Sequence, residues 1–177
     1  MSDFGQLIVE EIPGLRRYAW ALTRNAAQAD DLVQSCLLRA LVKRHLWRPD
    51  TNLRSWLFTM LHNQRASEIR RAVREQTRFA AAGVSAVVVA HSDPSGGLYL
   101  RDLERALGTL PAGQRQAILL VGLEGRRYEE AAKILMVPVG TIQSRVSRGR
   151  ETLRKVLGFE ADIAEPCSTE PGERLAA

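Results

Sequence analysis

Apolar side chains recur at intervals of three and four residues along most of the 177-residue chain, and no long segment alternates between apolar and polar positions. This pattern predicts helices and argues against a sheet. Pro13 suits the first turn of a helix, so we expect one helix to end before it and another to begin there. The helices predicted in the first half cover about residues 4–11, 13–23, 28–45 and 53–76.

The second half shows the same periodicity in shorter segments. Four helices are predicted there, over about residues 98–108, 111–122, 128–135 and 139–156. Their connections are only a few residues long, as expected of a compact helical bundle.

Between the two halves lies a stretch of small residues, AAAGVSAVVVAHSDPSGG, which ends in a run that breaks helices. A loop of about twenty residues is long for the inside of one domain, so we interpret this stretch as a tether. The predicted fold is therefore all-α, with two small helical domains, 1–76 and 99–157, joined by a flexible linker, 77–98. We expect the acidic tail, 158–177, to be disordered.

The net charge of +5 is unevenly distributed. Residues 1–75 carry 12 basic and 8 acidic side chains, and residues 99–157 carry 11 and 6. Two basic blocks indicate a polyanionic partner, although a solvated helical surface can give the same count.

Several other classes of protein are disfavoured. No run approaches the roughly 18 apolar residues that a membrane helix needs, and the first residues do not resemble a signal peptide. Cys36 and Cys167 lie far apart, which favours reduced cytoplasmic thiols over a disulfide or a zinc site. The histidines lack metal-ligand spacing and no catalytic motif is present, so we predict no enzyme, cofactor or metal. The expected location is cytoplasmic.

Residues 128–155, YEEAAKILMVPVGTIQSRVSRGRETLRK, have the pattern of a helix-turn-helix. Small alanines let the first helix approach the second, and a tight break follows at 136–138. Arginine and serine on the second helix can hydrogen-bond base edges or phosphates, although an ordinary helical hairpin with solvated arginines is the alternative. The polar residues on the outer side of the second helix are Thr141, Ser144, Arg145 and Arg148.

This segment resembles region 4, the promoter-reading domain of the extracytoplasmic-function class of bacterial sigma factors, with its pattern Y-E-E-A-A-x-x-L-x-V-P-x-G-T-V-x-S-R. The first half resembles region 2 of that class: ADDLVQSCLLRAL is similar to A-E-D-L-V-Q-E-T-F-L-R-A, and LRSWLFTMLHN is similar to F-R-A-W-L-x-x-I-A-R-N. The resemblance covers about residues 8–157. The stretch HLWRPDTNLRSWLFTMLHN is closest to the alphaproteobacterial general-stress branch.

The resemblance implies an RNA polymerase subunit that directs transcription initiation from promoters with −10 and −35 elements. The implied partners are the polymerase core, through its clamp helices and flap, promoter DNA and an anti-sigma protein. No membrane is involved, and we expect a monomer in the absence of partners. A stand-alone dimeric helix-turn-helix regulator, with residues 1–75 as a dimerisation or sensor module, is the alternative.

By the same resemblance, the helix at 28–45 docks on the polymerase clamp. The implied contact residues are Asp30, Asp31, Leu32, Val33 and Gln34. The other interpretation is that Leu32 and Val33 are core residues of the domain and that the aspartates cap the helix. One position can do both.

The loop 46–52 and the helix that follows are assigned, again by resemblance, to the opened −10 element. Aromatic rings can stack on unpaired bases, and basic side chains can hold the phosphates of the single strand. The candidate residues are Trp47, His62, Asn63, Arg65, Arg70 and Arg71. The −35 duplex is assigned to Thr141, Ser144, Arg145 and Arg148.

Phe58 is the ambiguous residue of the helix at 53–76. It falls on a basic side, so it either faces DNA or packs on the helix 13–23 through Tyr18 or Trp20. The inward stripe of the helix consists of Leu53, Trp56, Leu57, Met60 and Leu61.

Met136 stands in the turn where the sigma class often has glycine. If that position is left-handed, a residue with a side chain costs about 1–2 kcal/mol.

Overall fold

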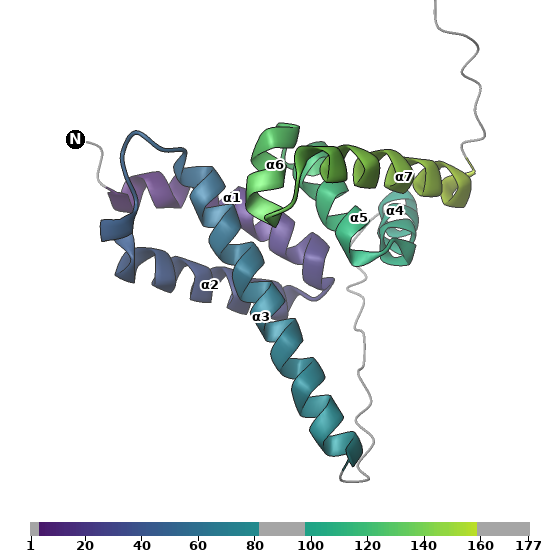
Figure 1. The fold of residues 1–177 in the computed structure, drawn as a ribbon, viewed down its shortest axis with the longest axis horizontal. Helices are drawn as coiled ribbons and strands as arrows, with labels where there is room; N and C mark the ends of the chain where they lie inside the picture. Colours follow the sequence, from purple (N-terminus) through teal and green to yellow (C-terminus); the bar gives the residue numbers. More distant parts are fainter. Residues whose placement is uncertain (1–3, 82–97, 159–177) are drawn as a thin grey trace, which may run out of the picture.

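The computed structural model describes residues 4–81 and 98–158, which form helices joined by turns, with no strand among them (Figure 1). The predicted all-α fold is therefore confirmed. The predicted linker beyond residue 81 and the predicted tail beyond residue 158 lie outside the described residues. The first block consists of α1 (Phe4–Thr23), α2 (Ala26–Val42), the short 3-10 helix η1 (Arg44–Leu46) and α3 (Leu53–Ala81).

Helix α1 runs through Pro13 without a break, so the predicted helix end before this proline is wrong. Proline removes one hydrogen bond to the carbonyl four residues earlier, at Val9. Both residues lie on the exposed side of α1, where water can satisfy that carbonyl. Ile8 and Leu15 are buried in the same core on either side of the proline, and this packing holds the two parts of the helix in line.

The core of the first block forms where α1, α2 and α3 meet. Phe58 is completely buried, with its ring centroid 5.3 Å from that of Tyr18. Of the two alternatives left open for Phe58, packing on α1 is therefore the correct one, with Tyr18 as the partner, and the ring does not face solvent. The Arg54 guanidinium lies 5.8 Å from the centroid of the same ring, which explains the basic surroundings seen in the sequence.

Cys36 belongs to this core. Its thiol donates a hydrogen bond to the Leu57 carbonyl across 3.6 Å, and burial raises the pKa of the Cys36 thiol to about 12. The thiolate is therefore scarce at neutral pH, and the residue acts as a small apolar side chain.

The second block contains the predicted helix-turn-helix. One predicted helix, 111–122, ends early and continues as a π-helical turn, in which the Glu124 amide donates to the Leu119 carbonyl over 3.0 Å. The small size of Gly149 lets α7 approach α5, since a Cβ there would collide with the Ile118 side chain. The elements are α4 (Leu98–Thr109), α5 (Ala112–Ile118), the π turn η2 (Leu119–Leu123), α6 (Tyr128–Leu135) and α7 (Val139–Leu157).

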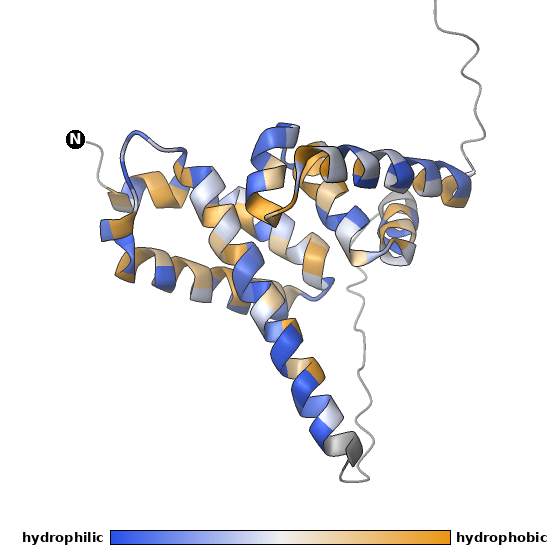
Figure 2. Ribbon diagram, viewed as in Figure 1, coloured by the Kyte–Doolittle hydropathy of each residue, from blue (hydrophilic) through white to orange (hydrophobic). Residues whose placement is uncertain are grey.

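The two blocks pack against each other. Helix α6 lies on α3 and the turn η2 lies beside α1, and the buried apolar residues of both blocks form one continuous cluster. Beyond Ala66, α3 projects away from this cluster, and Figure 2 shows its projecting part as mostly hydrophilic. Because the two blocks are packed together, residues from both can contribute to the same surface.

Met136 adopts the left-handed conformation, with φ 53° and ψ 47°, and its side chain is 69% exposed. Met136→Gly should therefore stabilise the protein by about 0.5–1 kcal/mol, because it removes the Cβ clash without losing a buried contact. Urea unfolding followed by circular dichroism measures the change.

Gly125 provides the matched control, because it is also left-handed and a Cβ there would meet nothing within 4 Å. Gly125→Ala should destabilise the protein by a similar amount. Equal stabilities for Met136→Gly and the unsubstituted protein would show that the turn carries no strain.

Candidate nucleic-acid interface

The outer side of α7 carries the residues predicted to contact duplex DNA. Arg148 is exposed and free to reach outward, whereas Thr141 and Ser144 are half-buried. The Ser144 hydroxyl donates to the Thr141 carbonyl over 3.0 Å. The Arg145 guanidinium lies on α5, since a Cβ built at Gly113 would be 3.0 Å from its Cζ atom. The four residues are thus unequal in their freedom to reach a ligand.

Three further polar residues of α7 are exposed on the flank next to Arg148, and the sequence reasoning missed them. They are Gln143, Ser147 and Arg150, and together with Tyr128 and Arg154 they line a shallow pocket. After Gly140 these residues follow one another at intervals of three or four, and this helical spacing could have identified them from the sequence.

The residues predicted to contact the opened strand divide between two faces of α3. Asn63 and Arg70 continue the face of Trp56 at intervals of seven residues, and Arg71 lies beside them on the flank toward α2. His62 and Arg65 lie on the face of Phe58, whose ring packs on Tyr18 of α1. The structure therefore brings the first three together and separates the other two from them.

Trp47 lies at the start of the Trp56 face. Its ring centroid is 5.3 Å from that of Phe4, and Phe4 also meets Trp56 edge-on at 6.5 Å. Sequence reasoning missed Phe4, because no local pattern links α1 to a loop more than 40 residues away. The indole Nε1 of Trp47 is buried and has no hydrogen-bond partner among the described residues.

A pocket of about 420 Å³ adjoins these rings. Side chains of both blocks line it, including Trp47, Asn52 and Trp56 from the first and Glu130 and Lys133 from the second. We refer to Trp47, Asn63, Arg70 and Arg71, together with this pocket, as the −10 surface.

His62 is unsuited to holding phosphate. Burial lowers the pKa of its imidazole, so the ring is neutral at pH 7. Its Nδ1 atom is buried without a hydrogen-bond partner. Position and charge both separate His62 from the basic residues of the −10 surface.

Helix α2 presents an exposed stripe that overlaps only in part with the residues predicted for polymerase binding, since it includes Asp31 and Gln34. Leu32 and Val33 are buried in the core, as the second interpretation held. Asp30 forms an ion pair with Arg16 at 3.0 Å. The aspartates do not cap the helix, because the Asn25 side chain does so by accepting from the Gln28 amide at 2.9 Å.

The exposed stripe follows helical spacing along α2. It contains Asp31, Gln34, Leu38, Leu41 and Val42. Its last three members are large apolar side chains on the surface, which is typical of a protein interaction site. We refer to these five residues as the α2 stripe.

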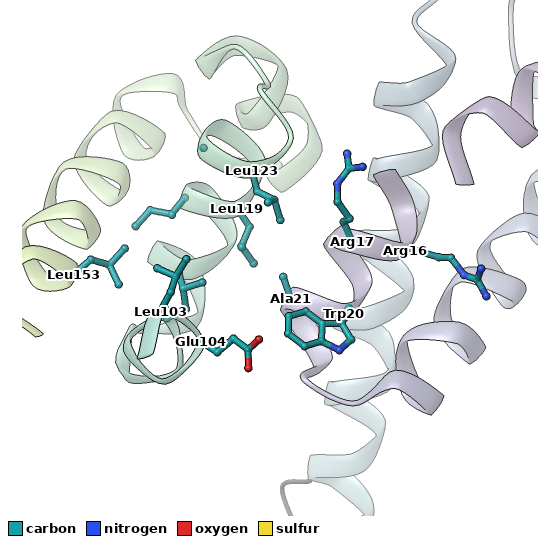
Figure 3. Close-up of a pocket in the computed structure, with 12 residues that line it drawn as sticks. Arg16, Arg17, Trp20, Ala21, Leu103, Glu104, Leu119, Leu123 and Leu153 are labelled. Atoms are coloured by element: carbon teal, nitrogen blue, oxygen red, sulfur yellow. The ribbon is translucent and has the colours of Figure 1, made fainter. Parts of the chain in front are cut away.

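A groove of about 580 Å³ runs between α1 and the second block (Figure 3). Trp20 and Ala21 of α1 face Leu103, Leu119 and Leu123 across it. The charged side chains Arg16, Arg17 and Glu104 also line this groove. An apolar floor with charged side chains around it suits an amphipathic helix.

The described residues contain neither a membrane-spanning helix nor a cluster of metal-ligating side chains. None of the helices in 4–81 and 98–158 is long and apolar enough to cross a membrane. Over the same ranges, no three His, Cys, Asp or Glu side chains lie together as metal ligands would.

Two family models match the chain, in the order expected from the sequence. Residues 8–62 match the Sigma2 domain of PhyR, and residues 100–153 match Sigma-70, region 4. The matched ranges correspond to the first block up to the middle of α3 and to nearly all of the second block.

Relatives and solved structures agree with these models. The chain is 41% identical over 150 residues to the ECF RNA polymerase sigma factor EcfG of Rhodopseudomonas palustris, covering 85% of this chain and 82% of the relative. It is 30% identical to the RNA polymerase sigma factor CarQ of Myxococcus xanthus, covering 91% and 93%. The sigma factor RpoE of Bartonella quintana, solved with the anti-sigma factor NepR, superposes with a TM-score of 0.77 at 38% identity, covering 91% of this chain and all of that one.

Proposed function

The chain belongs to the extracytoplasmic-function family of RNA polymerase sigma factors, and we propose that it divides promoter recognition among three surfaces on its two helical blocks. As a member of this family it binds the polymerase core and directs transcription initiation. No comparison favours a stand-alone regulator. We assign the chemistry of RNA synthesis to the polymerase and place the chain in the cytoplasm, where the polymerase works.

Helix α7 is the surface proposed to read the −35 duplex. The supporting observation is the exposed polar side of a helix-turn-helix, with Arg148 unobstructed. An arginine can form two hydrogen bonds to one guanine in the major groove, and the other basic residues can hold phosphates. In this division of labour, residues 99–157 form the duplex-binding domain.

The −10 surface is proposed to hold the opened strand, which places this task in residues 1–76. Unstacking a base costs a few kcal/mol, and stacking on an aromatic ring returns about 1–3 kcal/mol. Trp47 supplies the ring beside a pocket, while Arg70 and Arg71 follow along the same face. The half-buried Arg65 pairs with Glu68 at 3.6 Å and faces the other block, so we give it a minor part.

The α2 stripe is proposed as the polymerase-binding surface. Its acidic end, at Asp31, can pair with basic residues of the clamp, and its apolar end can anchor the contact. Leu32 and Val33 then contribute indirectly, because their burial fixes the orientation of the helix.

An anti-sigma protein is a further proposed partner. The Bartonella quintana RpoE was solved with the anti-sigma factor NepR, and CnrH, 27% identical with a TM-score of 0.64, was solved with the cytosolic domain of CnrY. In the present chain, the apolar groove of Figure 3 offers Trp20, Leu103 and Leu119 as contacts for the apolar side of a partner helix. Copurification of a small protein whose removal restores transcription would check this proposal.

In vitro transcription with core polymerase tests the function as a whole. The purified chain and core together should give run-off products from a genomic fragment library, and neither should do so alone. Premelting the −10 region should relax the need for the −10 surface but not for α7. Absence of any product, combined with tight binding of a palindromic duplex without core, would contradict the proposal.

Arg148→Ala should weaken −35 duplex binding by about 1–3 kcal/mol if it contacts a base, and should lower the salt slope by about one if it contacts a phosphate. Arg145→Ala should cost less, since part of that side chain is engaged with α5. Fluorescence anisotropy with the chain bound to core measures both.

Arg74→Ala is the matched control, because Arg74 is exposed on the projecting part of α3. It should leave duplex binding unchanged. An equal loss for Arg145→Ala and Arg148→Ala would mean that Arg145 leaves α5 when DNA binds. Loss of core affinity in either variant would contradict the division of labour.

A further inference from the structure

We propose that the free protein is autoinhibited by a buried ion-pair latch, in which Glu124 holds the two blocks together so that α6 obstructs the −10 surface. This inference rests on the proposed function of that surface. It concerns the regulation of the chain by its own fold, before any partner binds.

Glu124 is the centre of the latch. It belongs to the second block, its side chain is completely buried, and both of its partners belong to the first. The Arg54 Nη2 atom lies 2.9 Å from Glu124 Oε2, and Arg17 Nη2 lies 3.2 Å from the same oxygen. Arg17 Nε also donates to Oε1 at 3.3 Å. One carboxylate thus forms ion pairs with two guanidinium groups across the junction.

The local backbone positions Glu124 for this contact. The π turn widens the helix just before it, and Arg126 Nε donates to the Glu124 carbonyl at 3.2 Å. On the opposite side, a Cβ at Gly14 would lie 3.1 Å from both Arg54 Nη2 and Glu124 Oε2. The absence of a side chain at Gly14 therefore leaves room for the ion pair.

Closure brings α6 over the edge of the −10 surface. Asn52 Nδ2 donates to Glu130 Oε1 at 3.3 Å, and Glu130 lines the same pocket as Trp47. A carboxylate at this position repels the phosphates of a single strand and occupies space beside the rings. The α2 stripe remains exposed, so closure leaves the polymerase-binding surface open.

Like charges oppose closure at the other end of the junction. Arg115 of the second block lies near Arg24 and Arg65 of the first. Burial is the larger cause that lowers the pKa of Arg115, and the positive charges of Arg24 and Arg65 lower it further. The Arg24 guanidinium also lies against Gly108 of α4. Because one end of the junction attracts and the other repels, loss of the Glu124 charge should shift the equilibrium toward the open arrangement, which only the apolar contacts between the blocks then oppose.

Breaking the latch need not unfold the protein, since separation of the blocks exposes the unpaired guanidinium groups to water. Small-angle X-ray scattering of the full chain therefore provides the first test. Glu124→Gln should increase the radius of gyration, and Arg115→Gln should reduce the fraction of open molecules. Glu129→Gln, which removes an exposed charge on α6, is the control and should scatter like the unsubstituted chain.

Binding of a fluorescein-labelled single-stranded DNA of random sequence provides the second test. Glu124→Gln should bind it about tenfold more tightly, because apparent affinity scales with the open fraction. Circular dichroism melting verifies that each variant is folded. If Glu124→Gln scatters like the unsubstituted chain, the latch is refuted. If Glu124→Gln opens without a gain in DNA affinity, obstruction by α6 is refuted. If no variant binds the DNA at all, the proposed role of the −10 surface is contradicted, but the latch is not.

Discussion

Replacing Phe58 by alanine is expected to lower the free energy of unfolding by about 3–5 kcal/mol. The ring is completely buried at the centre of the first block, against Tyr18 and beneath the Arg54 guanidinium. Alanine loses the transfer free energy of the ring and leaves a cavity that the surrounding helices cannot fully close. Urea denaturation of the full chain, followed at 222 nm, measures the loss.

Two further variants make this result specific. Phe58→Leu retains most of the buried apolar surface and should cost clearly less than alanine. Val73→Ala removes a side chain that is 56% exposed on α3 and should change stability by no more than about 0.5 kcal/mol. If Phe58→Ala lowers the free energy of unfolding by less than about 1 kcal/mol, the ring is not packed in the core. Contact with DNA would then be the better explanation for it.

Phe58 also shows where the sequence pattern stopped being informative. A helical wheel finds the main apolar stripe of α3, but α3 is contacted on more than one side, by α1, α2 and α6. A ring outside the stripe can therefore be central to the core. Its basic neighbours indicated solvent or DNA, whereas Arg54 in fact bridges Glu11 and Glu124 above the ring.

The helix-turn-helix was predictable because it is a local structure. An alanine pair, a tight break and an apolar periodicity all lie within 30 residues, and the boundaries of α6 and α7 follow them closely. The left-handed Met136 was predictable for the same reason. The break at Pro13 was predicted wrongly, because burial of Ile8 and Leu15 on the two sides of the proline outweighs a local preference.

Contacts between distant segments could not be predicted in this way. Nothing near Trp47 indicates Phe4, and nothing near Glu124 indicates Arg17 or Arg54. The π turn that positions Glu124 has no signature in the sequence beyond an apolar run. Helical spacing alone divides the predicted −10 residues between two faces of α3. The direction from which the second block approaches those faces, by contrast, is set by tertiary packing.

Leu38→Glu is expected to weaken binding of core polymerase by at least about 2 kcal/mol, or roughly thirtyfold, without destabilising the fold. Leu38 is 65% exposed in the middle of the α2 stripe, so it contributes little to the core. Apolar anchors near the centre of an interface carry a large share of its affinity, and a carboxylate there is buried without a partner on binding. Competition of the unlabelled variant against labelled chain for core measures the loss.

Val9→Glu is the matched control, since Val9 is 61% exposed on α1 and lies outside the stripe. Both variants place a new charge at an exposed apolar position, so a nonspecific effect of charge should appear in both. An equal loss of core affinity in both would contradict the assignment, as would an unchanged affinity for Leu38→Glu. If Leu38→Glu alone loses affinity while its unfolding midpoint is unchanged, the exposed side of α2 forms the contact, and the buried Leu32 and Val33 serve to hold that side in place.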